Sequence, residues 1–323
     1  RDPEMSRGLG DVYKRQNQTE LNVDEDVRDT VANPTIGIVG LGLIGGSFAR
    51  AYAAAGWPVR AWDVDADTLA IARIDVLAGF LRTHDDLAAC DLIILAAYPD
   101  ACLDWLRSHA EELGELARCG KAPMVIDAAG VKGHVCSEAF GIAAKHGFSF
   151  CGAHPMAGTE FSGFAYAHAG LFNGAPVVLT PPELNDIDRL DMLDRIHDLL
   201  APCGFGRFSI TTPAVHDRVI AFTSQLAHVV SNAYVKSPTA QEHHGFSAGS
   251  YRDLTRVAHL NPHMWSELMI EDADSLAYEI ATLQRNLEDV RRALVDRDRD
   301  ALEALLADGD RIKRALDDEG ERM

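Results

Sequence analysis

The sequence has few of the features that mark secreted, membrane-bound or zinc-binding proteins. Its 323 residues include six cysteines, which are scattered and form no CxxC pair, so we expect reduced thiols and no metal site. No apolar run reaches the roughly 18 residues of a membrane span, and the first residues lack the basic-then-apolar order of a signal peptide. We therefore expect a cytoplasmic protein. The cysteines are Cys90, Cys102, Cys119, Cys136, Cys151 and Cys203.

Positive charge is also scarce, since 30 basic residues face 49 acidic ones and the formal net charge is −19. A surface this negative repels nucleic acid and anionic lipid, so neither is an expected partner. Residues 203–265 reverse the trend, because they hold five basic and three acidic side chains. A local excess of positive charge within an acidic protein is where we expect an anionic substrate.

Residues 1–34 are polar, with charges of both signs and no helical or strand periodicity, which predicts a disordered extension. Within it, residues 1–16 have the character of a non-native junction and are left out of the fold. The remaining length and the 47% of hydrophobic residues are typical of about two globular domains.

Between residues 35 and 212, short apolar runs alternate with helical stretches. The run at 35–39, a glycine-rich turn, a helix at 44–55 and a second run at 59–62 make one βαβ unit. Further apolar runs lie at 92–97, 124–128, 148–151 and 176–179, and helical stretches at 102–116 and 131–145. This alternation predicts a doubly wound parallel sheet with helices on both faces.

Residues 213–323 are predicted to form an all-helical domain for substrate binding and dimerisation. Apolar residues recur there at steps of three and four among charged neighbours, as an amphipathic helix requires. The pattern lasts about two heptads, which favours a helix packed on its own domain over a long coiled coil, with a homodimer expected. Its members are Ile280, Leu283, Leu287, Val290 and Leu294.

The glycine-rich turn has the pattern GxGxxG at Gly40, Gly42 and Gly45, directly between a predicted strand and a predicted helix. The first glycine permits the tight turn, the second lets the backbone approach a pyrophosphate, and the third lets helix and strand pack closely. The helix start at Leu43 and Ile44 points its N–H groups at the phosphates. The pattern predicts a Rossmann-type dinucleotide-binding domain.

Asp63 ends the second predicted strand, 18 residues beyond Gly45. A carboxylate there accepts hydrogen bonds from the adenosine ribose hydroxyls and repels a 2′-phosphate. The neighbours Val64, Asp65 and Asp67 offer no arginine that would hold such a phosphate. NAD is therefore favoured over NADP as the cofactor. The alternative to a dinucleotide site is a glycine turn that happens to be followed by an aspartate.

Residues 152–163 read GAHPMAGTEFSG, with three glycines, a proline and a histidine just after an apolar run. Such a rigid loop is expected at the carboxyl edge of the sheet, where ligands of these folds bind. A lone histidine is more often structural than catalytic. Beside a nicotinamide, however, a neutral His154 would be able to take a proton from a substrate hydroxyl.

Five spaced motifs run through the chain: GLGLIGGS at 40–47, DAAGVKG at 127–133, GAHPMAGTEFSG at 152–163, HDRVIAFTSQLAH at 216–228 and GSYRDLTRVAHLNPHMW at 249–265. In order and spacing, from about residue 35 to residue 291, they resemble the prephenate dehydrogenase family, which includes arogenate and cyclohexadienyl dehydrogenases. The resemblance implies that NAD takes a hydride from C4 of prephenate while the C1 carboxylate leaves as CO2, which gives 4-hydroxyphenylpyruvate.

The resemblance also implies roles for individual residues. His154 matches the catalytic histidine that accepts the proton of the C4 hydroxyl, and Arg256 matches an arginine that binds a substrate carboxylate with its planar fork. Glu160 and Asp253 match acidic residues of an ionic network around that arginine. His228 matches a histidine that lines the pocket near the substrate side chain, and Trp265 matches an aromatic wall; without the resemblance, Trp265 would be assigned to the core.

Two positions depart from the family's pattern. Gly130 stands where a serine commonly precedes VK, and Gln225 stands where many members have a histidine after Ser224. A water molecule or the hydroxyl of Thr159 would then replace the missing serine at the substrate. Because an acidic side chain near the substrate's ammonium would favour arogenate, His228 at that place favours prephenate.

The residues argue against two other classes of protein. A hydroxyacid or imine reductase would need a catalytic lysine in the helical domain, and Lys236 is the only lysine between Lys145 and Lys313. A non-catalytic NAD-sensing regulator would not need His154 and Arg256 together with Asp63.

Overall fold

The computed structural model describes residues 32–159, 161–242, 246 and 249–320, with side chains given up to residue 318. Residues Pro34–Met323 make one compact unit. The predicted disordered extension at 1–34 and the junction at 1–16 fall almost entirely outside the described residues. Nothing in the described helices is both long enough and apolar enough to cross a membrane.

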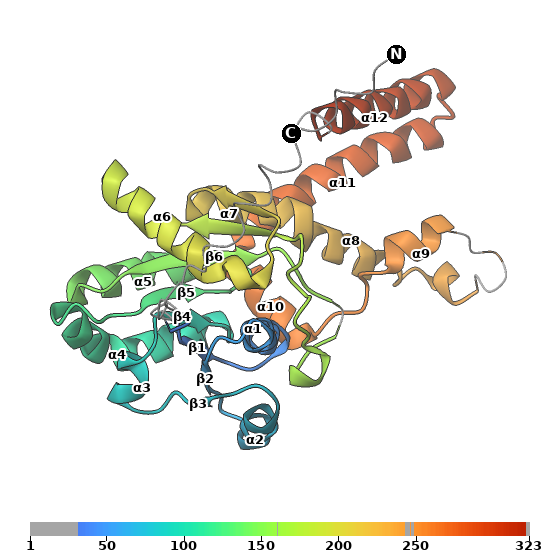
Figure 1. The fold of residues 1–323 in the computed structure, drawn as a ribbon. Helices are drawn as coiled ribbons and strands as arrows, with labels where there is room; N and C mark the ends of the chain where they lie inside the picture. The colour runs from blue at the N-terminus through green and yellow to red at the C-terminus, as the bar shows by residue number, and fades with distance from the viewer. Residues whose placement is uncertain (1–31, 160, 243–245, 247–248, 321–323) are drawn as a thin grey trace, which may run out of the picture. The chain divides into compact units, whose positions relative to one another are not determined.

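One eight-stranded sheet runs through residues 36–210, in the order β3-β2-β1-β4-β5-β6-β7-β8 (β1 to β6 are labelled in Figure 1). Strands β1 to β6 are parallel, and the order reverses beside β1, which is the switch point of a doubly wound sheet. The strands are β1 (Ile36–Val39), β2 (Val59–Trp62), β3 (Gly79–Phe80), β4 (Leu92–Leu95), β5 (Met124–Asp127), β6 (Phe150–Pro155), β7 (Pro176–Thr180) and β8 (Arg207–Ile210).

The doubly wound sheet followed by helices is confirmed, but the expectation that all strands are parallel is wrong at β7. This strand pairs antiparallel with β6, and β8 then pairs parallel with β7. The connection between β6 and β7 contains the single turn η1 (Phe164–Tyr166) and no long helix in its described part. A parallel pairing needs a crossover of a dozen or more residues, usually helical, whereas an antiparallel one does not.

Alternation along the buried strands divides their side chains between two hydrophobic cores. In β4, Leu92 and Ile94 belong to one core, while Ile93 and Leu95 belong to the other. Both faces are therefore covered, as the uninterrupted apolar run requires. The covering helices, visible in Figure 1, are α1 (Leu43–Ala54), α2 (Ala66–Asp75), α3 (His84–Ala88), α4 (Pro99–Arg118), α5 (Gly133–His146) and α6 (Asp186–Leu200), and η2 (Ala201–Cys203) follows α6.

All the described elements after the last strand are helical. They are α7 (Pro213–Ile220), η3 (Ala221–Gln225), α8 (Leu226–Tyr234), η4 (Pro238–Gln241), α9 (Gly249–Thr255), α10 (Pro262–Glu271), α11 (Ala273–Val295) and α12 (Arg299–Gly320). α7 and α8 continue through η3, one π-helical turn. The division into domains at residue 212 stays a prediction, since Pro34–Met323 cluster as one unit.

The helical part buries little apolar surface of its own. Its core holds three buried residues, Ala221, Leu226 and Leu276, with partly buried neighbours such as Ile280 and Leu283. The predicted amphipathic helix is α11, and its Leu287 and Leu294 are 59% and 58% exposed. Helix α12 packs against α11 (Figure 1). It likewise exposes apolar side chains, including Leu306 and Leu316.

Candidate functional site

The glycine turn at the end of β1 has the geometry that a dinucleotide requires. Gly40 adopts a φ of +91°, which side chains rarely tolerate. A Cβ on Gly45 would lie 1.9 Å from the carbonyl oxygen of Gly40, so α1 approaches the turn too closely for any side chain. A Cβ on Gly42 would meet no atom within 4 Å, which leaves open space in front of the α1 N-terminus. The turn thus fits a pyrophosphate.

Asp63 lies beside this turn, at the end of β2. One carboxylate oxygen accepts a hydrogen bond from the backbone N–H of Leu41 at 2.6 Å, and the other from that of Asp65 at 2.8 Å. These bonds fix the carboxylate next to the glycine turn. Ser47, by contrast, has a structural role, because its buried hydroxyl donates to the carbonyl of Leu43 and accepts the N–H of His168.

A buried ion pair lies at the carboxyl end of β5. Lys132 and Asp127, both fully buried, pair directly where β5 ends. The Lys132 ammonium also donates to the carbonyl of Ala153 at 2.8 Å, and Asp127 accepts the N–H of Ala153 at 3.1 Å. The pair therefore fixes the backbone of the residue that precedes His154.

His154 is the fifth residue of β6 and meets the helical part of the chain through its ring. Its Nδ1 lies 2.9 Å from Nε2 of His216 in α7, and Nδ1 of His216 lies 2.6 Å from a carboxylate oxygen of Asp217. The same carboxylate accepts the backbone N–H groups of Lys132 and Gly133, at 2.7 and 2.6 Å. His154 thus ends a chain of hydrogen bonds that is anchored at the start of α5.

The surroundings of His154 favour its neutral form. Burial, followed by the proximity of His216 and of Lys132, holds the pKa of His154 well below its usual value. Burial raises the pKa of Asp217, but the hydrogen bond from His216 and those from the backbone outweigh it, and the pKa ends below its usual value. The site therefore combines a neutral imidazole with an ionised carboxylate near pH 7.

A second group of expected residues lies within the helices. The rings of His228 (α8) and Trp265 (α10) are 3.9 Å apart between centroids, and Nδ1 of His228 lies 2.9 Å from the carbonyl oxygen of Val257. Burial and the nearby Arg256 lower the pKa of His228, although the bond to Val257 opposes them. Arg256 itself is exposed, and no ion pair is found for it among the described residues.

A cavity of about 400 Å³ adjoins this second group. Its lining is largely apolar and includes Phe222, Leu226 and Leu283, with Asp253 and Arg256 among the lining residues. His154 does not line it. Within the described part of the chain, no hydrogen bond, ion pair or ring contact joins His154 to Arg256, His228 or Trp265.

The remaining predicted residues are placed as follows. Thr159 is exposed, and its hydroxyl accepts the N–H of Phe161 at 3.3 Å. Glu160 lies outside the described residues. A Cβ on Gly130 would make ordinary contacts with Leu268 of α10, at 3.4 and 3.6 Å, so a serine would fit there. Gln225 is buried, and its side-chain carbonyl oxygen has no partner among the described groups.

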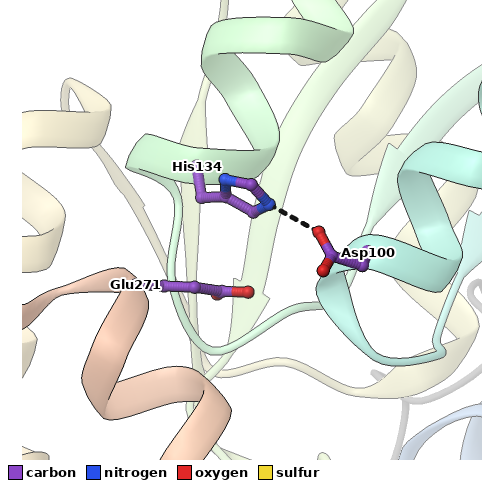
Figure 2. Close-up of side chains that lie close together, drawn as sticks. All are labelled: Asp100, His134 and Glu271. Carbon is purple, nitrogen blue, oxygen red and sulfur yellow. Dashed lines mark hydrogen bonds and ion pairs between the residues drawn. The ribbon is translucent and has the colours of Figure 1, made fainter.

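A third group, which sequence reasoning missed, gathers Asp100, His134 and Glu271 from α4, α5 and α10 (Figure 2). Nε2 of His134 lies 2.8 Å from an oxygen of Asp100, while both oxygens of Glu271 are buried without a partner. Burial raises the pKa of Glu271 to about 7. Among the described residues, these are the side chains that could together hold a cation, and Asp100 and His134 already satisfy one another without one.

Sequence reasoning also missed the partners of His154. His216 and Asp217 begin the motif HDRVIAFTSQLAH, and Lys132 lies in DAAGVKG, so both motifs were visible. No spacing rule, however, shows that side chains 62 residues apart form one hydrogen bond.

Comparison with known proteins covers nearly all of the described chain. The family description "Prephenate dehydrogenase, nucleotide-binding domain" matches residues 48–205, and "Prephenate dehydrogenase, dimerization domain" matches residues 212–308. The first match begins inside α1 and does not include the glycine turn. The assignment of that turn therefore depends on its geometry alone.

Individual relatives agree with these matches. A cyclohexadienyl dehydrogenase of Zymomonas mobilis is 30% identical over 292 residues, which cover 87% of this chain and 95% of the relative. A prephenate dehydrogenase of Bacillus subtilis is 28% identical over 284 residues, covering 83% of this chain and 72% of the relative. The crystal structure of an arogenate dehydrogenase from Synechocystis is similar with a TM-score of 0.67 at 26% identity, covering 87% of this chain and 99% of that one.

Proposed function

Because the chain belongs to the prephenate dehydrogenase family, we propose that it catalyses the NAD-dependent oxidative decarboxylation of prephenate to 4-hydroxyphenylpyruvate. The observation that carries this proposal is the placement of His154. The ring lies near the carboxyl end of β6, on a backbone held by the Lys132–Asp127 pair, and its lowered pKa favours the neutral form. This is the form a general base needs near pH 7.

The chemistry makes modest demands on the protein. NAD, when bound, accepts the hydride from C4 of the substrate ring. As the hydride leaves, His154 takes the proton of the C4 hydroxyl, and the electron pair of the broken O–H bond forms the C4 carbonyl. The resulting dienone loses its C1 carboxylate as CO2, and the released electron pair makes the ring aromatic; a proton then returns to the phenolate oxygen. The residues therefore have to orient the substrate and hold one proton.

We assign the cofactor contacts to Gly40, Gly42 and Gly45, the backbone of Leu43 and Ile44, and the carboxylate of Asp63. The open space at Gly42 supports the pyrophosphate assignment. The fixed carboxylate of Asp63 would accept hydrogen bonds from the ribose hydroxyls and repel a 2′-phosphate, which favours NAD over NADP.

The substrate contacts are proposals of the same kind. Arg256 would bind a carboxylate of the substrate, with His228 and Trp265 beside it, and its exposed side chain is available for this role. Thr159, Glu160 and Asp253 are proposed to complete the substrate site around Arg256; Asp253 lines the same cavity as the arginine.

Arogenate is the second candidate substrate, since one relative is a cyclohexadienyl dehydrogenase and a similar structure is an arogenate dehydrogenase. The two substrates differ at a side chain that carries a keto group or an ammonium. The pKa of His228 is lowered, so this ring is neutral near pH 7 and gives an ammonium no ionic partner. This favours prephenate.

We further propose a homodimer formed through the helical domain that begins at residue 213. The match to a dimerization domain and the exposed apolar side chains of α11 and α12 support it. A cytoplasmic location is part of the same proposal.

The deciding experiment measures NADH formation with prephenate and with arogenate, each with and without tyrosine. We expect the higher kcat/KM with prephenate. A kcat/KM at least tenfold higher with arogenate, about 1.4 kcal/mol of discrimination, would reassign the substrate. No NADH with either substrate would refute the proposed activity.

A further inference from the structure

The hydrogen bonds behind His154 run in one direction. We infer that His216 and Asp217 are positioning residues, which hold His154 as the tautomer protonated on Nδ1 and so leave its Nε2 free to accept the substrate proton. Both side chains lie on α7, outside the sheet, and both are buried.

The direction follows from Asp217. Its carboxylate already accepts the N–H groups of Lys132 and Gly133, at 2.7 and 2.6 Å. An ionised carboxylate can only accept hydrogen bonds, so the 2.6 Å contact with His216 requires a proton on Nδ1 of that ring. In the form of His216 that carries a single ring proton, this proton is on Nδ1, and Nε2 is therefore an acceptor.

The same logic fixes the next ring. Nδ1 of His154 lies 2.9 Å from this acceptor and must donate to it. A neutral His154 then has no proton on Nε2, which is the nitrogen left for a substrate. If His216 were instead an imidazolium, its Nε2 would donate, Nδ1 of His154 would accept, and Nε2 of His154 would carry the proton and lose its use as a base.

The arrangement also supports the protonated state, in a step that rests on the proposed function. When the substrate O–H bond breaks, the proton forms a bond with Nε2 of His154, and the ring becomes an imidazolium. Its Nδ1–H remains bonded to His216, whose own Nδ1–H points at the negative Asp217. The carboxylate thus stabilises the new charge through one intervening ring without itself taking a proton.

The first test needs no substrate and reads the tautomer directly. Nitrogen-15 NMR of histidine-labelled protein at pH 7.5, with the His154 signals identified by their loss in His154→Asn, should show a proton on Nδ1 of His154 and none on Nε2. In His216→Leu both tautomers should appear. A wild-type His154 protonated on Nε2 would overturn the inference while leaving the proposed activity untouched.

The second test separates positioning from a structural role. His216→Leu should lower kcat per folded enzyme by about 100-fold with little change in either KM, whereas His216→Gln, whose carbonyl oxygen can accept the Nδ1 proton, should stay within about tenfold of wild type. In Asp217→Asn the side-chain amide can donate to His216 and so reverse the hydrogen bonds from His216 to His154. This variant should resemble His216→Leu, and it provides the test if the leucine variant does not fold.

The matched control is His197→Leu, which removes a histidine with a 62% exposed side chain on α6. It should leave kcat unchanged. If His216→Leu keeps the wild-type kcat per folded enzyme, or if glutamine at that position is no better than leucine, His216 does not position the base.

Discussion

The two groups of expected site residues differ in how the chain supports them. Around His154, buried polar side chains bond one another and the backbone: Asp127 with Lys132, and Asp217 with His216. Around Arg256, the guanidinium is exposed and without an ion pair among the described residues, and the neighbouring cavity is mostly apolar. The contrast supports a site in which the fold positions the proposed proton acceptor in advance, whereas the proposed carboxylate-binding residue would gain its partner when a substrate binds.

The largest effect is expected from breaking the buried support of His154. Lys132→Met leaves the carboxylate of Asp127 buried and unpaired, which should cost about 3–5 kcal/mol of unfolding free energy. Urea unfolding measures this cost. The control is Arg107→Met, which breaks an exposed pair with Glu138 and should cost less than about 1 kcal/mol. Equal costs for the two variants would show that the buried pair does not stabilise the sheet edge.

Removing the proposed base, His154, should affect turnover and not folding. His154→Asn should lower NADH formation from prephenate by at least about 100-fold, since general base catalysis typically contributes that much or more. The affinity for NAD, followed by fluorescence titration, should stay unchanged. Unchanged NADH production would contradict the assignment of His154.

The pH dependence of turnover tests the same residue. Because the pKa of His154 is lowered, the neutral base persists as the pH falls below 6.5, the usual value for histidine. On the proposal that His154 is the base, kcat should therefore hold at pH 6 and fall only at lower pH. A fall in kcat centred at or above pH 6.5 would show that the surroundings of His154 do not lower its pKa.

Arg256 should behave in the opposite way. Its fork would hold a substrate carboxylate equally in the ground state and the transition state, so Arg256→Ala should raise the KM for prephenate, by about 10- to 100-fold, far more than it lowers kcat. Arg252→Ala removes another basic side chain, from α9, and should change neither constant more than about twofold. A fall in kcat at constant KM would show that Arg256 interacts with the substrate only in the transition state.

Local structure and contacts between distant segments differ in how well the sequence predicts them. The glycine turn, β1, β2 and Asp63 form one continuous stretch, and local periodicity with turn chemistry predicts them nearly to the residue. The antiparallel β7 and the bond from His154 to His216 depend on how distant segments meet. The resemblance supplied Arg256, His228 and Trp265 as candidates, but only coordinates show that His228 and Trp265 touch and that Arg256 stands open.

Helix α10 contributes to several of these contacts, because Trp265 lies beside His228, Leu268 lies close to Gly130 and Glu271 lies near His134 (Figure 2). The pKa of Glu271 is raised to about 7 by burial, so the folded state holds this proton more tightly than the unfolded chain does. The stability it contributes is full below about pH 4.5 and is lost as the pH rises through 7. Glu271→Gln should therefore match the wild-type Tm at pH 5 and exceed it by about 2–4 °C at pH 8. Glu303→Gln, an exposed substitution on α12, should show no such difference between the two pH values. An equal Tm difference for Glu271→Gln at pH 5 and pH 8 would mean that this carboxylate is already ionised in the folded protein, paired with His134 or with a bound cation.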